Sequence, residues 1–358
     1  MKERLLRIVT APEAITLLLL VVALGMGHSL SPNFLDASYL LDKTSMLVPI
    51  GLMAVAMTFV IAAGQIDLSV ASNAVLCMVI GARLYEAGVP MGWVMPLTLL
   101  TGALLGLLNG IGVVLLRLPA LVFTLGTLAL YRGIAQVLIE ERTIKGFPKW
   151  FLGIDYTKYT LPNLAGPATQ PVKAVGRAIR STGIEVPAPF IGLLVVVIVA
   201  TVVMTMTTFG RRVLAIGTNE QAARYSAVRT DRLKMIVFTL SGLSAGAAAL
   251  VMMSMLRSVD HKQFRGGELL AITAVVLGGT SIFGGRATVP GTFIAMMLLV
   301  VVQSAMSLAR WQAETRLLVV GALLIGAVLL LEALRRLAER LIRASGAKKN
   351  TLAGGTDA

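Results

Sequence analysis

The chain has 358 residues, of which 56% are hydrophobic and only 14% charged, and its mean hydropathy is +0.84. Soluble domains carry about 45–50% apolar and about 25% charged residues, so this composition excludes an ordinary soluble protein. The net charge of +14 indicates basic loops facing anionic lipid on the cytoplasmic side of a membrane. Because no aromatic residues are interleaved with the basic ones, we expect no nucleic-acid partner.

Apolar runs recur along the whole chain, and runs of about 18 or more such residues predict membrane-spanning helices. We expect about ten spans, some of them broken or re-entrant, in a single transmembrane domain covering residues 1–358. They are placed at 13–30, 45–63, 67–86, 91–116, 119–139, 188–208, 234–256, 268–283, 289–309 and 316–333. The expected fold class is therefore an all-α polytopic membrane protein.

Lysine and arginine set the orientation, because cytoplasmic loops carry an excess of both. The two ends of the chain are basic, and the C-terminal tail 335–358 contains "RRLAERLIRASGAKK". We therefore expect both termini in the cytoplasm, together with the basic segment 209–234. The segment 140–187 would then lie outside as a periplasmic loop. It disagrees with the charge rule, since it is also basic, and its prolines and glycines predict a partly irregular structure.

The first interruption of an apolar run lies in "GLMAVAMTFVIAAGQIDLSVAS", where Gly64, Asp67 and Ser69 break the pattern. Broken backbone persists in a membrane only where protein or a water-lined cavity surrounds it. An intramembrane carboxylate is expensive and marks a functional site by default. Two interpretations compete: Asp67 caps the helix that follows a tight re-entrant turn, or it binds an ion or substrate directly.

A second broken run reads "ITAVVLGGTSIFGGRATVPGTF". The glycines that interrupt it include Gly278, Gly279, Gly284 and Gly285. Setting Thr58 against Thr273 aligns "TFVIAAGQ" with "TAVVLGGT". Corresponding broken segments in two halves of a chain indicate a transporter built from internal repeats; coincidence between two glycine-rich apolar stretches is the alternative. Both breaks are candidates for the translocation path.

Arg132 completes the translocation-path candidates, since it falls inside the fifth expected span. A buried arginine must face a cavity or a partner such as a carboxylate. We interpret it as structural or gate-associated, with direct contact to solute as the alternative. On the fourth span, Gly102, Gly106 and Gly110 form a stripe of small residues that predicts close helix packing.

Enzymatic chemistry finds no support in the sequence. One cysteine and two histidines argue against a metal site, and no nucleophile–histidine–acid set is visible. The phosphate-binding pattern G-x-x-x-x-G-K-[ST] is also missing from the sequence. We therefore predict no catalytic residues, no bound metal and no cofactor on this chain.

Four stretches together resemble the ribose-type ABC importer permeases, a family that moves pentoses, hexoses and, in some members, autoinducer-2. These stretches are "MTFVIAAGQIDLSVAS", "LPALVFTLGTLALYRG", "FGRRVLAIGTNEQAARYSAV" and "ELLAITAVVLGGTSIFGGRATVPGTF". The resemblance covers nearly the whole chain in the same order, and it includes polar and glycine positions. The family commonly carries glycine where this chain has Ala227.

The resemblance implies a permease subunit in a bacterial inner membrane. Two such subunits, identical or different, form the channel, and a periplasmic binding protein delivers a monosaccharide or similar polyol-like solute. A separate cytoplasmic ATPase binds ATP and Mg²⁺ and drives transport. The rival class is an ion-gradient-driven secondary transporter, which explains the repeats and Asp67 but assigns no role to the segment 209–234.

The resemblance also implies that the segment 209–234 contains a coupling helix that docks into a groove of the ATPase. "TNEQAARYSAV" reads as a short helix with Thr218 or Asn219 as its N-cap and an acid in its first turn. The candidate coupling residues are Gly217, Asn219, Glu220, Ala223 and Arg224. The alternative is a solvated basic loop that serves only the topology.

Overall fold

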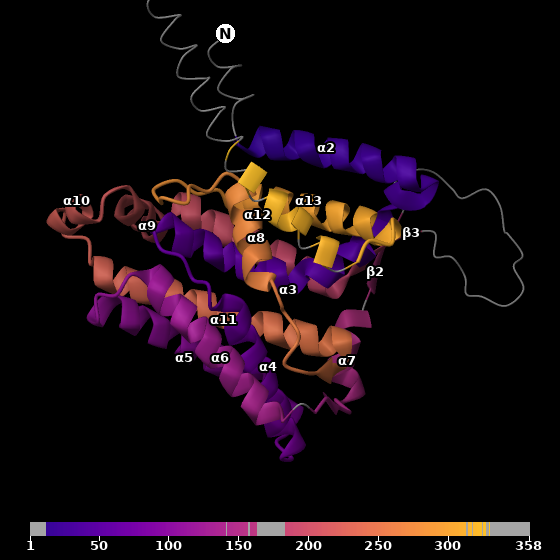
Figure 1. The fold of residues 1–358 in the computed structure, drawn as a ribbon, viewed down its shortest axis with the longest axis horizontal. Helices are drawn as coiled ribbons and strands as arrows, with labels where there is room; N and C mark the ends of the chain where they lie inside the picture. Colours follow the sequence, from indigo (N-terminus) through magenta and orange to yellow (C-terminus); the bar gives the residue numbers. More distant parts are fainter. Residues whose placement is uncertain are drawn as a thin grey trace, which may run out of the picture.

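The computed structural model describes residues 12–140, 142–156, 158–162, 183–312 and parts of 314–329. Helices dominate this described part (Figure 1). They are α2 (Pro12–Leu30), the short 3-10 helix η1 (Pro32–Leu35), α3 (Ala37–Ala62), α4 (Val70–Glu86), α5 (Met91–Leu115), α6 (Ala120–Ile139), α7 (Lys149–Tyr156), α8 (Ala188–Met206), α9 (Thr208–Thr218), α10 (Glu220–Tyr225), α11 (Thr230–Leu256), α12 (Gly267–Leu277) and α13 (Val289–Leu308).

Among the described residues, seven helices are long and apolar enough to cross a membrane: α2, α3, α5, α6, α8, α11 and α13. This confirms the all-α polytopic fold class. Two of the expected spans are shorter: α4 has 17 residues, and α12 has 11. The expected span 316–333 lies partly outside the described residues, and the tail 335–358 lies wholly outside them.

Helix α12 ends earlier than the sequence pattern predicts. We expected a helix over 268–283, but it stops at Leu277, because Gly278 forms the C-cap and Gly279 follows with a φ of +95°. A left-handed residue at this position, usually glycine, is the common way to end a helix. The rest of the expected span is a glycine-rich connection to α13, so this crossing is broken, as the pattern predicted.

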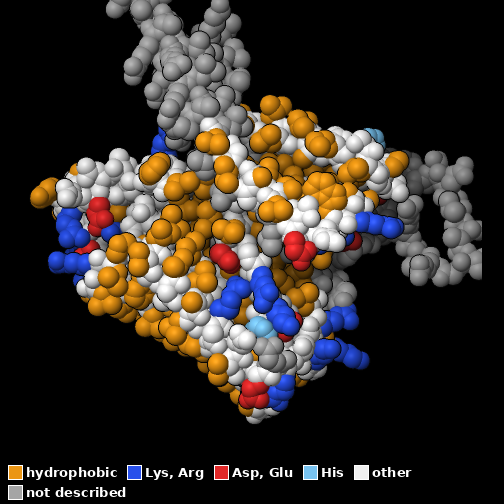
Figure 2. All heavy atoms as spheres, in the orientation of Figure 1, with side chains coloured by type: hydrophobic (Ala, Val, Ile, Leu, Met, Phe, Trp, Pro, Cys, Tyr) orange, Lys and Arg blue, Asp and Glu red, His pale blue; other side chains and the backbone are white. Residues whose placement is uncertain are grey.

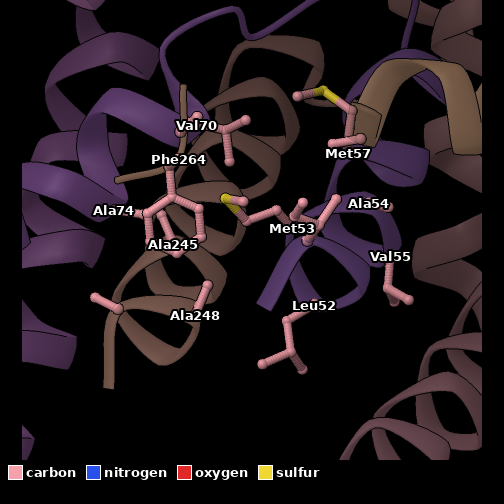
Figure 3. Close-up of a cluster of buried hydrophobic side chains, with 14 of the residues drawn as sticks. Leu52, Met53, Ala54, Val55, Met57, Val70, Ala74, Ala245, Ala248 and Phe264 are labelled. Carbon is pink, nitrogen blue, oxygen red and sulfur yellow. The ribbon is translucent and has the colours of Figure 1, made fainter. Parts of the chain in front are cut away.

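Helix α3 forms the centre of the fold. Within the apolar stretch of α3 that is long enough to cross a membrane, 89% is buried inside the protein. The helix begins at Ala37, eight positions before the expected start at residue 45, because Asp36 caps it by accepting from the Tyr39 amide at 3.1 Å. Figure 3 shows Met53 and Met57 of α3 facing small side chains of α4 and α11. Helices that are apolar on all sides belong in such a core.

Helices α5 and α11 approach each other closely through glycines. A Cβ on Gly106 would meet the carbonyl oxygen of Phe238, and a Cβ on Gly102 would meet that of Gly242. Without side chains the two backbones come into direct contact, which is how small residues promote helix association in membranes. The predicted packing role of this stripe is confirmed.

The two ends of the helix bundle differ. At one end lie α9 and α10, and at the other lie α7 and two small antiparallel sheets (Figure 1). Strand β1 (Ile144–Lys145) pairs with β4 (Ser258–Val259), and β2 (Lys158–Pro162) pairs with β3 (Gly183–Pro187). The segment 140–187 thus contains short regular elements, while residues 163–182 lie outside the described part. Figure 2 shows hydrophobic side chains across most of one face, with a charged group at the α10 end.

Candidate functional site

The six-residue helix α10 projects from the α9–α11 connection. Its N-cap is Asn219, whose side-chain oxygen accepts from the Ala222 amide at 2.9 Å. The other N-cap candidate, Thr218, donates instead to the Leu214 carbonyl inside α9. A capped short helix is set at a fixed angle to the helix before it, because the cap satisfies one of its free N–H groups.

Ion pairs fasten α10 to the first turns of α11. Lys234 Nζ lies 2.6 Å from a Glu220 carboxylate oxygen, and Arg224 lies 2.8 Å from the Asp231 carboxylate. Arg224 also lies 3.6 Å from Glu220. We call these four residues the charge clamp. The clamp borders a polar pocket of about 730 Å³, which the α5–α6 connection lines on its other side. The clamp therefore links α10 directly to α11.

The structure separates the coupling candidates into buried and outward-facing residues. Ala223 is only 5% exposed and belongs to an apolar cluster with Ile216 and Leu233. Ala223 therefore packs between α10 and the rest of the protein, and its role in coupling stays a prediction. Tyr225 is 91% exposed at the end of α10, and the sequence analysis missed it. Its signal in the sequence was an aromatic residue among polar ones at the tip of a predicted surface helix.

Three segments meet at glycines immediately before α10. A Cβ on Gly217 would collide with the Ala62 carbonyl oxygen and the Gly285 amide nitrogen. A Cβ on Gly284 would lie 2.8 Å from the Cα atoms of both Gly217 and Gly64. We call Gly64, Gly217, Gly284 and Gly285 the glycine junction. The glycine junction joins the end of α9 to the breaks after α3 and α12. Gly217, a candidate coupling residue, therefore lies against Gly64, Gly284 and Gly285, which are candidates for the translocation path.

The two broken helices end in the same way. After α3, the Gly64 amide donates to the Ile61 carbonyl at 2.9 Å, and Gln65 donates to Val60 at 3.1 Å. After α12, the Gly279 amide donates to the Val276 carbonyl at 2.9 Å, and Thr280 donates to Val275 at 3.2 Å. Gly64 and Gly279 both have positive φ. This matched termination follows the register of the sequence alignment, which supports an internal repeat.

Asp67 is completely buried in the break after α3. One carboxylate oxygen accepts from the Ser69 amide at 3.0 Å and from the Ser69 hydroxyl at 2.7 Å, and the other accepts from the Ser241 hydroxyl at 2.8 Å. Asn109 of α5 donates to the Ser69 hydroxyl, and Tyr131 of α6 lies 3.2 Å from Asn109. The carboxylate thus contacts α11 directly, and the Ser69 hydroxyl extends the hydrogen-bond network to α5 and α6.

The hydrogen bonds of Asp67 place it in the turn that precedes α4. Its carboxylate bonds the amide of Ser69, the N-cap residue of α4, and the Ser69 side chain itself makes no cap. Asp67 therefore closes a turn one residue before the helix. None of the pockets described here is lined by Asp67.

Sequence comparisons identify the family. The family described as "Branched-chain amino acid transport system / permease component" matches residues 39–328. The chain belongs to this family of ABC importer permeases. A relative in Yersinia enterocolitica, named autoinducer 2 import system permease protein LsrD, is 34% identical over 86% of this chain and 87% of its own length.

Further relatives with the same printed name occur in Photorhabdus laumondii and Escherichia coli. The first is 33% identical over 88% of this chain and 89% of its own length. The second is 33% identical over 86% of this chain and 88% of its own length. No solved structure matches the chain. The permease is therefore a multi-pass membrane protein of a transport system and does not belong to an enzyme family.

One residue after α10, Ala227, has a strained backbone conformation. Ala227 directly follows the end of α10 with a φ of +60°, in the left-handed region that favours glycine. The Val228 amide reaches back to the Ala223 carbonyl at 3.1 Å and closes this turn. A glycine at this position would adopt the same conformation without the clash that a Cβ introduces.

Arg132 and Glu268 form an incomplete ion pair inside the permease. Arg132 lies on α6, and Glu268 lies in the first turn of α12, with 3.9 Å between a guanidinium nitrogen and a carboxylate oxygen. The side chains are 25% and 17% exposed. The carboxylate partner is of the kind expected for an arginine within a membrane. Glu268 itself was not among the sequence candidates.

Proposed function

We propose that this permease forms the channel of an ATP-driven importer for a small polyhydroxylated solute. Autoinducer-2 is the first candidate, and a monosaccharide is the second. The names of the relatives carry this proposal, because each covers most of both chains at 33–34% identity. The family description, which mentions branched-chain amino acids, makes leucine the natural comparison solute.

The proposed location is a bacterial inner membrane, with α9, α10 and both termini on the cytoplasmic side. The basic residues of the segment 209–234 support this orientation, because cytoplasmic loops collect lysine and arginine. The seven long helices, α4, the broken α12 and the expected span 316–333 together make an even number of crossings. An even number brings both termini to the same side of the membrane. The segment 140–187 then faces the periplasm, where a solute-binding protein would dock.

The proposed partners are a second permease subunit, identical or different, a periplasmic binding protein and a cytoplasmic ATPase that binds ATP and Mg²⁺. Helix α10 is the proposed coupling helix. The exposed Tyr225 and the fixed cap at Asn219 suit a rigid projection that fills a groove. Movement of the ATPase would then pass to α11 through the charge clamp and to both broken helices through the glycine junction.

The test is reconstitution of the permease in proteoliposomes with an ATPase and a binding protein from the same organism. We expect uptake of autoinducer-2 or D-ribose that requires ATP inside and the binding protein outside. L-Leucine serves as the comparison solute. Uptake driven by a proton or sodium gradient, with neither ATP nor binding protein, would overturn the proposal and favour a secondary transporter.

A further inference from the structure

We propose that Arg132 and Glu268 form a transient binding subsite for the hydroxyl groups of the solute as it crosses the membrane. The inference rests on the proposed function, because a polyhydroxylated solute must pass through the permease. On this proposal the two side chains bind a ligand. The alternative is a structural ion pair that only links α6 to α12.

Unsatisfied polar atoms are concentrated on this pair. Within the described residues, five enclosed side-chain nitrogen or oxygen atoms make no hydrogen bond. Three of the five belong here: Nε and Nη2 of Arg132 and Oε2 of Glu268. Enclosed polar groups in native proteins are almost always hydrogen-bonded, because each unmet bond costs about 1–3 kcal/mol. Three unsatisfied polar atoms in one place therefore indicate a ligand that binds there transiently.

The separation of the two charged groups also argues against a purely structural ion pair. Charge-assisted hydrogen bonds close to about 2.7–2.9 Å. The charge clamp in the same molecule reaches this range, at 2.8 Å for Arg224 with Asp231. Arg132 and Glu268 remain 3.9 Å apart. Both are largely enclosed, so competition from bulk water does not explain the open geometry.

The chemistry of the two groups selects the ligand. A guanidinium only donates hydrogen bonds, and a carboxylate only accepts them. A hydroxyl group does both, so neighbouring hydroxyls of one solute can accept from Arg132 and donate to Glu268 together. An apolar side chain such as that of leucine offers neither contact. The pair therefore fits a polyol or a sugar-like ring, the solute class proposed for this permease.

The position in the fold agrees with a place on the path. Glu268 lies in the first turn of the 11-residue α12, whose N-cap is Gly266 with a φ of +74° and no capping side chain. The first N–H groups of such a helix lack partners within the helix. Glu268 lies at the end of α12 opposite the glycine break, so the pair belongs to one of the two broken helices, the kind of element at which transporters commonly build solute sites.

The first experiment measures uptake by the reconstituted importer with Arg132→Gln, Glu268→Gln and the charge exchange Arg132→Glu with Glu268→Arg. Each single variant should lower the uptake rate of autoinducer-2 or D-ribose by about tenfold or more, as expected for lost charged hydrogen bonds. The charge exchange should leave uptake impaired, because the donor and acceptor sides are reversed. Recovery of uptake by the exchange would show a structural ion pair and overturn the subsite.

The second experiment needs no turnover, so it separates failure of the subsite from failure of the proposed function. Ile272 lies one turn after Glu268 on the same face of α12 and is half-buried. In a Cys77→Ala background of the assembled importer, Ile272→Cys should react with a water-soluble thiol reagent, and D-ribose should slow that reaction at least about threefold. Arg132→Gln should abolish the protection. Trp150→Cys, at an exposed position on α7, is the control: it should react with the reagent and show no protection. Labelling that D-ribose leaves unchanged would overturn the subsite.

Discussion

The Ser241 hydroxyl donates to the Asp67 carboxylate at 2.8 Å, although 174 positions of sequence separate the two residues. Ser241 lies seven positions, about two helical turns, after Lys234 of the charge clamp. Residues spaced in this way share one face of a helix. One face of α11 therefore contacts both α10 and the break after α3. This gives the permease a short physical connection between the α10 end of the helix bundle and its interior.

Removal of the carboxylate charge should weaken the break after α3. Asp67→Asn replaces one acceptor oxygen with an NH₂ donor, which would face the donors of Ser69 or the hydroxyl of Ser241. This change should lower the free energy of unfolding by about 1–3 kcal/mol. Ser241→Ala should cost a similar amount, and the double variant should cost less than the sum. Denaturation in mixed micelles measures these effects. Ser244→Ala is the control, since that hydroxyl bonds only within α11. Normal stability with complete loss of uptake in Asp67→Asn would favour direct contact with the solute.

The charge clamp should affect coupling more than stability. Lys234→Ala and Glu220→Gln remove partly exposed pairs, which are worth at most about 1 kcal/mol each. We expect the number of ATP molecules hydrolysed per solute transported to rise several-fold, because α10 would no longer move α11 with it. The control Arg142→Ala breaks a comparable pair with Glu140 at the opposite end. An unchanged ratio in the clamp variants would remove the clamp from the coupling path.

A methyl group at the glycine junction should be poorly tolerated. Gly217→Ala places a Cβ against the Ala62 carbonyl and the Gly285 amide, so we expect lower thermal stability and loss of ATP-dependent uptake. Gly192→Ala, in the second turn of α8, has open space around the new Cβ. It should stabilise its helix by up to about 1 kcal/mol, because alanine is the better helix former. Thermal unfolding of the two variants compares the effects directly, and equal behaviour would contradict the close contact.

Truncation of Tyr225 should weaken the bond to the ATPase without unfolding the permease. The side chain is almost fully exposed, so Tyr225→Ala removes no internal packing. Aromatic anchors at interfaces commonly contribute more than about 1 kcal/mol, so the Kd for the ATPase should rise about tenfold. Binding of the purified ATPase to the permease in nanodiscs measures this constant. Trp150→Ala, an exposed aromatic residue on α7 at the opposite end, should leave it unchanged.

Most of the fold could be predicted from the sequence, because each crossing is a local property of composition and length. Helices α5, α6, α8 and α13 end within two residues of the expected spans. The errors lie where local signals are subtle. Asp36 starts α3 early by capping it, and two glycines stop α12 before it completes a crossing.

By itself, the sequence determined the membrane setting, the helical class, the positions of both breaks and the family resemblance, since these depend on residue type and spacing along the chain. Only the tertiary structure decided which residues meet. It placed Gly217 against both breaks, Ser241 against Asp67, and Glu268 beside Arg132. These contacts join segments far apart in the chain, and helix packing sets them: the glycines of α5 and α11 allow a close approach that no single apolar run specifies.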